Sequence, residues 1–139
     1  MVIKYYDAPD VQEIAEELIK ELGWDHISLD NISFIRSRGS SSRYTMARCH
    51  ALGKAMQIGM KRKKGFYLVE VISEKYDKLP EIDKIKTIIH ELMHIPKSFG
   101  GGFIHHNHVH EKNVENVYNH FCSLKERKLN HSKEKNVWF

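Results

Sequence analysis

The sequence predicts a compact α+β domain in which a small antiparallel sheet packs against an N-terminal helix, a central helix and a C-terminal helix. The chain has 139 residues, which suits one domain and leaves little room for a second. Stretches with the period of a helix are interspersed with short apolar stretches typical of strands. The expected strands are joined by short connections, and this favours an α+β arrangement.

The first half of the chain is expected to form one helix and two strands. From Pro9 to Leu22, apolar residues recur every three or four positions, with Pro9 suited to a first helical turn and Gly23 to a helix end. Alternating apolar residues from Ile27 to Ile35 predict a strand. A serine-rich loop, a second strand, one or two helical turns and an exposed connection are expected over residues 37–42, 44–52, 55–60 and 61–65.

The second half is expected to form one strand and two helices. The aromatic and β-branched stretch from Phe66 to Ile72 is the strongest strand signal in the chain. Pro80 opens a helix that Pro96 ends. The apolar stripe of this helix is expected to comprise Ile82, Ile85, Ile89 and Leu92. A loop with three successive glycines and a last helix follow over residues 99–103 and 111–128. The inward face of that helix is expected to comprise Val114, Val117, Tyr118 and Phe121. The domain is therefore expected to span residues 1–129, followed by a polar C-terminal tail over 130–139.

Charge and cysteine content narrow the functional classes. Lys and Arg number 22 against 18 Asp and Glu, and the pI is near 9.0, which permits an acidic partner such as nucleic acid without requiring one. Cys49 and Cys122 are too far apart for a zinc knuckle, and we expect two reduced thiols. No run of about 18 apolar residues occurs, so no membrane span is expected. The N-terminus lacks the pattern of a secretory signal, and we expect a cytoplasmic protein.

The stretch His90-Glu91-Leu92-Met93-His94 carries the clearest chemical signal. Residues four apart on a helix share a face, so His90 and His94 can both direct a ring nitrogen at one metal ion. Glu91 projects to the side and can instead accept a proton from a metal-bound water. The apolar stripe of the same helix is expected to face away from the histidines and to anchor it. The stretch therefore predicts two zinc ligands and a catalytic base.

Catalytic zinc usually has three protein ligands, and the third is expected after Pro96. Six of the ten histidines lie between His90 and His110. A metzincin would have a glycine three and a histidine six residues after His94, where this chain has Lys97 and Gly100, so that subclass is excluded. Spacing alone does not choose among the remaining candidates, which are His105, His106, His108, His110, Glu111 and Glu115.

The stretch from Ile89 to Gly101, followed by a histidine and by Val114-Glu115, resembles small archaeal and phage metallopeptidases of the zincin-like class, which are related to SprT-like proteases. Softer matches upstream extend the resemblance over Ile32 to Tyr118, at Arg36–Ser40, Ser42-Arg43, Ala47-Arg48 and Val69–Glu74. The resemblance implies a zincin-like fold, a zinc cofactor and hydrolysis of peptide bonds. It also implies a ligand about a dozen residues after His94, which indicates His106, with His105 and His110 as alternates.

The working hypothesis is a zinc-dependent metallohydrolase, a peptidase that acts on peptides or proteins through a zinc-bound water activated by Glu91. One alternative is a nucleic-acid-associated module with a structural zinc, which would need a fourth protein ligand. Another is a SprT-like protease that acts on DNA-bound proteins, and a third is a zinc hydrolase of another substrate class. For nucleic acid, the expected phosphate contacts are Arg36, Arg38 and Arg43 in and around the serine-rich loop.

Overall fold

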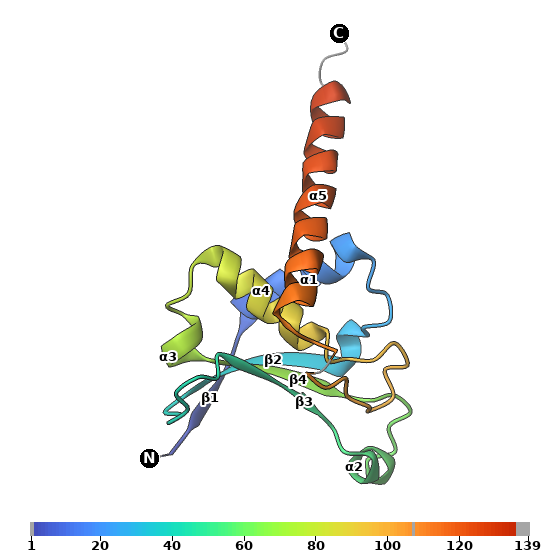
Figure 1. Cartoon of the computed structure of the whole chain (residues 1–139). Coiled ribbons are helices and arrows are strands. Elements are labelled where there is room, and N and C mark those ends of the chain that lie inside the picture. The colour runs from blue at the N-terminus through green and yellow to red at the C-terminus, as the bar shows by residue number, and fades with distance from the viewer. Residues whose placement is uncertain (1, 107, 136–139) are drawn as a thin grey trace.

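A sheet of four strands forms the floor of the computed structural model, which describes residues 2–106 and 108–135 (Figure 1). The α+β class is confirmed. The strands lie in the order β1-β2-β4-β3, with β1 at Lys4–Asp7, β2 at Ile32–Arg38, β4 at Tyr67–Ile72 and β3 at Ala47–Ala51. The short strand β1 was not predicted, because its four exposed residues show no apolar alternation.

The sheet is mixed, so the prediction of an antiparallel sheet is wrong at its centre. The outer pairs, β1 with β2 and β3 with β4, are antiparallel, but β2 and β4 run parallel, with Ile32 opposite Tyr67 and Ser37 opposite Ile72. A parallel pair needs a long crossover connection. The segment between β2 and β4 supplies it, because it contains β3 and the short helix α2 (Lys54–Gly59).

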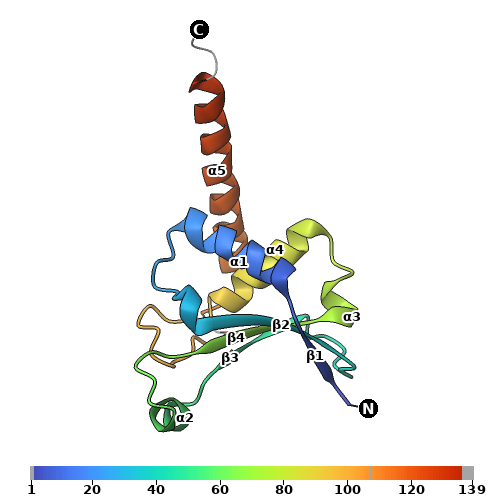
Figure 2. The same ribbon diagram turned by 180° about the vertical axis from the view of Figure 1, so that it is seen from behind.

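Three long helices lie on one side of the sheet, two of them packed across it and the C-terminal one leading away from it (Figures 1 and 2). These are α1 (Pro9–Leu22), α4 (Glu81–Leu92) and α5 (Glu111–Lys135). Helix α1 begins and ends as predicted, and Gly23 closes it in the left-handed conformation at φ 65°. Two short elements, the 3-10 turn Leu29–Asn31 and the helix α3 (Ser73–Tyr76), precede β2 and follow β4.

Helix α5 continues to Lys135 instead of ending at residue 128. The domain boundary expected after residue 129 therefore falls inside a helix, and residues 130–135 of the expected tail are helical. Residues 136–139 of that tail lie outside the described part of the chain. Two ion pairs of 2.7 Å fasten α5 to α1, and they join Lys125 to Glu17 and Lys128 to Glu21.

The core lies between the sheet and the helices. From β4 it includes Tyr67, Val69 and Val71, and from α1 it includes Val11, Ala15 and Leu18. Helix α5 contributes its predicted face, with Val114 and Phe121 buried and Val117 and Tyr118 packed against the core.

The predicted stripe of α4 is correct for Ile89 and Leu92, which are buried, and Ile85 packs against the core. It is wrong for Ile82, which is 51% exposed, and Ile88 is buried although it was not predicted. At about 100° per residue, the centre of the buried face lies near Ile85 and Leu92, so Ile82 falls at its margin in the first helical turn.

The remaining predictions concern the two cysteines and membrane-spanning helices. Cys49 is partly buried, Cys122 is exposed, and both are free thiols. Among the described residues, every helix is too short or too polar to cross a bilayer.

Candidate metal centre

The end of α4 presents two histidines to the same side. His90 lies in the last turn of the helix, and His94 follows the helix in a turn that the Glu91 carbonyl closes by accepting the His94 N–H at 3.2 Å. The two ring centres are 5.0 Å apart. His94 is fully buried at 1% exposure, and His90 is half-buried. The spacing of four residues thus places both rings on the same side, as helix geometry predicts.

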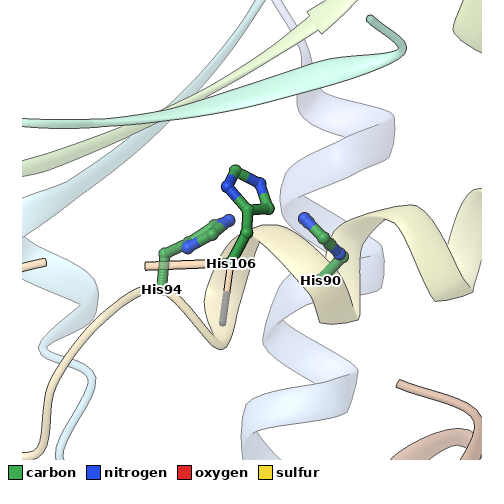
Figure 3. A group of neighbouring side chains, drawn as sticks. All are labelled: His90, His94 and His106. Atoms are coloured by element: carbon green, nitrogen blue, oxygen red, sulfur yellow. The ribbon is translucent and has the colours of Figure 1, made fainter. Parts of the chain in front are cut away.

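His106, from the loop between α4 and α5, completes a cluster of three imidazoles. Its ring centre lies 5.3 Å from that of His90 and 4.7 Å from that of His94. One ring nitrogen from each histidine lies within 4.8 Å of the others. Figure 3 shows the three rings gathered around a common space.

The backbone of Ile104 orients the His94 ring. Its N–H donates to the His94 carbonyl at 2.8 Å, and its carbonyl accepts a hydrogen bond from Nδ1 of the His94 ring. A neutral imidazole that donates through Nδ1 keeps a lone pair on Nε2, which is the atom left to face the cluster. Three imidazoles with one oriented in this way form a donor set that suits a divalent transition metal.

The pKa values of the helix histidines favour neutral, ligating rings. Burial, followed by the neighbouring His94 and His106 rings, lowers the pKa of His90 to about 4. Burial also lowers the pKa of His94, against the opposing effect of the hydrogen bond to Ile104. Both imidazoles are therefore unprotonated at neutral pH.

Glu91 lies beside the cluster as a buried carboxyl group. Only 4% of the residue is exposed, and its Oε1 is 3.8 Å from Nε2 of His94. Burial raises the pKa of Glu91 to about 7. A carboxyl group with such a pKa can both take and release a proton near neutrality.

A cleft of about 840 Å³ opens over the histidines and Glu91. One wall is β3 with the segment before it, over residues 44–50, and the other walls come from α4 and from the start of α5. Within the described chain, β3 is the last strand in the sheet order, so its outer edge borders this cleft.

The family model described as putative phage metallopeptidase matches residues 3–133 of the chain. The protein belongs to this phage metallopeptidase family. No curated protein and no solved structure matches the chain. The resemblance to phage metallopeptidases is thus confirmed, and the match contains all three clustered histidines and Glu91. The family name describes metal-dependent peptidases that act on peptides or proteins, and the histidine cluster is compatible with the metal it implies.

The other candidates for a third ligand lie outside the cluster. His105 and His110 are exposed, and the His105 ring lies 5.5 Å from the ring of Phe103. The His108 side chain is also exposed. Glu111 and Glu115 line the cleft, but Glu115 is bound to Lys86 at 2.7 Å. The spacing of these residues could not show which one joins the cluster, because the loop backbone determines which histidine points toward His90 and His94.

The three arginines expected to contact phosphate differ in their surroundings. Arg36 pairs with Asp10 at 2.7 Å and with Asp77 at 2.9 Å, so its guanidinium is occupied inside the domain. Arg38 and Arg43 are exposed. No local pattern indicates the Arg36 pairs, because Asp10 and Asp77 are distant along the chain.

Proposed function

We propose that the protein is a zinc-dependent peptidase whose metal is held by His90, His94 and His106. The observation that carries this proposal is the approach of three imidazole nitrogens to within 4.8 Å beside a buried carboxyl group. Three protein ligands leave a position for water or substrate, as catalytic zinc sites require. When bound, zinc supplies Lewis-acid chemistry that lowers the pKa of water towards about 7 and polarises a carbonyl oxygen.

Glu91 is the general base of the proposed reaction. Its carboxylate takes a proton from the attacking water and passes it to the nitrogen that leaves the cleaved peptide bond. The position of Oε1 beside His94 Nε2, at 3.8 Å, supports this role. A pKa of about 7 supports it too, because the group must be able to hold a proton between the two transfers.

The edge strand β3 supports an extended peptide as substrate. Its inner edge pairs with β4, and its residues 47–50 line the cleft. A strand edge offers backbone N–H and C=O groups to an extended chain, which can bind as a further strand. A peptide held in this way would run along the cleft past Glu91.

The proposal is tested by the substitution Glu91→Gln, which preserves size and removes the base. We expect zinc binding at one ion per chain, as in the parent protein, and cleavage of a labelled denatured protein slower by about 10²–10⁴-fold. The matched control is Glu81→Gln, in the exposed first turn of the same helix, which should cleave at the parent rate. Equal cleavage by the Glu91→Gln variant and the parent would exclude this mechanism.

A second candidate function, contact with nucleic acid, rests on an uneven distribution of charge. Residues 31–69 contain nine Arg and Lys residues and no Asp or Glu. Arg36 is paired internally, and Arg62 donates to Asn31 at 2.6 Å. The other seven are exposed, namely Arg38, Arg43, Arg48, Lys54, Lys61, Lys63 and Lys64. Such a concentration of exposed positive charge suits a phosphate backbone.

This candidate predicts salt-dependent binding to duplex DNA. Replacing Arg38, Arg43 and Arg48 by Gln should weaken binding and reduce the slope of log affinity against log salt by about 0.9 for each phosphate that is no longer neutralised. The matched control replaces three exposed basic residues of α5, Lys112, Arg127 and Lys133, and should bind as the parent does. Equal binding by both triple variants, or none at low salt by the parent, contradicts the candidate.

A further inference from the structure

The loop that carries His106 is attached to the sheet by the hydroxyl group of one tyrosine. Tyr67, the first residue of β4, is fully buried. Its hydroxyl accepts the N–H of Gly101 at 3.1 Å and donates to the carbonyl of Gly102 at 2.7 Å. A single side chain thus satisfies backbone groups of two adjacent residues in a loop that has no regular secondary structure.

The same loop also packs closely against the chain just before β4. The N–H of Gly65 donates to the Phe99 carbonyl at 3.1 Å, and the Phe99 ring meets the Tyr67 ring edge-on at 4.8 Å between centres. A Cβ atom at Gly65 would lie 2.6 Å from the backbone nitrogen of Gly101, which is closer than real contacts allow. The position of the loop is therefore set by β4 and by the residues leading into it.

This attachment reaches the histidine cluster within a few residues. Two residues after Gly102, Ile104 makes both of its backbone hydrogen bonds to His94, one to the carbonyl and one to the ring. His106 follows two residues later and meets the other two rings. A shift of the glycines would therefore move both the Ile104 carbonyl, which accepts the hydrogen bond from the His94 ring, and the imidazole of His106.

We propose that Tyr67 is a positioning residue of the metal centre. Its hydroxyl fixes the glycine loop, so that Ile104 orients His94 and His106 reaches the two histidines of α4. The inference rests on the proposed zinc site and extends it to a residue that touches neither metal nor substrate. It gives Tyr67 a role in the affinity and geometry of the metal centre, in addition to its role in the core.

The test is the substitution Tyr67→Phe, which keeps the buried ring and removes only the hydroxyl. We expect zinc affinity to fall by about 10–100-fold, which is the range found for residues that support metal ligands. Competition with a chromophoric chelator measures this affinity. With Co²⁺ in place of zinc, the visible absorption spectrum should change, because the ligand geometry changes. The matched control is Tyr76→Phe. Tyr76 is also fully buried, but its hydroxyl has no hydrogen-bond partner among the described residues, so parent-like affinity and spectrum are expected.

A purely structural role for Tyr67 gives a different result. In that case Tyr67→Phe lowers the melting temperature while the folded variant keeps the parent's zinc affinity and cobalt spectrum, and the proposal is wrong. A second variant, Gly65→Ala, displaces the loop with Tyr67 intact and should weaken zinc binding in the same way. Amide exchange of the metal-free parent needs no variant: the Gly101 and Ile104 N–H groups should be protected like those of β4, and fast exchange overturns the proposal.

These measurements separate the inference from the proposed peptidase activity. A parent protein that binds zinc in a Tyr67-dependent manner but cleaves no peptide supports the inference and contradicts the proposed function. A parent that cleaves peptides and whose zinc affinity is the same in the Tyr67→Phe variant supports the function and overturns the inference.

Discussion

The two parts of the metal centre are held in different ways. His90 and His94 come from one helix and the turn that ends it, and the burial of Ile88, Ile89 and Leu92 fixes that helix against the core. His106 comes from a loop whose position depends on residues far away in the sequence, at Gly65 and Tyr67. The helix ligands therefore follow from local periodicity, whereas the loop ligand follows from tertiary contacts.

The backbone conformation of the loop also depends on tertiary contacts. Gly101 has φ 97°, and Phe99, a residue with a side chain, has φ 50°. Such left-handed conformations are costly for residues other than glycine and persist when their surroundings compensate. For Phe99 the compensation is burial of its ring against Tyr67. We infer that the loop is the part of the centre most sensitive to substitution nearby.

The largest expected effects separate the two parts directly. We expect His94→Ala and His106→Ala each to weaken zinc binding by more than about 100-fold, beyond the effect of a supporting residue. Only His94→Ala should also destabilise the metal-free protein, by about 2–3 kcal/mol, because it empties a buried site and leaves the Ile104 carbonyl unpaired. His106 is exposed, so its replacement should change metal-free stability by less than about 0.5 kcal/mol.

Urea unfolding of the metal-free variants and zinc titration check this pair. His105→Ala is the control, because His105 is exposed and lies next to His106 in the sequence but outside the cluster. It should resemble the parent in both measurements. Loss of zinc binding in His105→Ala with retention in His106→Ala would reverse the assignment of the third ligand.

The contrast between helix and loop also explains what could be predicted from the sequence. The helical period predicts that His90 and His94 share a face and that a helix precedes Pro96. The structure agrees, except that α4 ends at Leu92 and His94 lies in the turn that follows. His106 was favoured by resemblance alone, since four histidines lie close together in the loop and spacing could not choose among them. Tyr67 was part of a correctly predicted strand, but nothing local distinguishes a tyrosine that packs from one that binds a distant loop.

The errors in the predicted fold also arise from contacts between residues that are distant in the sequence. The parallel pairing of β2 with β4 depends on how the chain between them folds, and strand propensity carries no information about it. The ion pairs of Arg36 join residues 26 and 41 positions apart, so the arginine looked available for phosphate when read in its local context. Local patterns located most of the elements, and long-range contacts determined how the strands pair and which partners the polar side chains bind.

An intermediate effect is expected from the glycines of the loop. Gly101→Ala places a side chain at φ 97° and a Cβ 3.0 Å from Oε1 of Gln57, so we expect a loss of about 1–2 kcal/mol and zinc affinity weaker by up to about tenfold. The matched control is Gly102→Ala. A Cβ there would lie 3.5 Å from Pro96, an ordinary contact, and the residue is exposed, so the change should stay within about 0.5 kcal/mol. Thermal unfolding and zinc titration measure both, and equal behaviour of the two variants would contradict the special role of Gly101.

The smallest expected effect lies in the ion pairs of Arg36, remote from both parts of the centre along the chain. Hydrogen bonds from Arg36 hold the pKa of Asp10 below its usual value of 3.8. Because the folded pKa is depressed, the stabilisation is complete above the unfolded pKa and is lost as the pH falls through the folded pKa. Asp10 is 54% exposed, so after solvent screening we expect Asp10→Asn to cost about 0.5–1 kcal/mol at pH 7 and progressively less below about pH 4.

Urea unfolding between about pH 7 and pH 2.5 checks this expected loss of stability. The control is Asp30→Asn, which replaces an exposed carboxylate and should follow the parent. Zinc affinity at pH 7 should be unchanged in Asp10→Asn, and a fall in affinity would show that the metal centre depends on the overall stability of the fold as well as on the contacts of its loop.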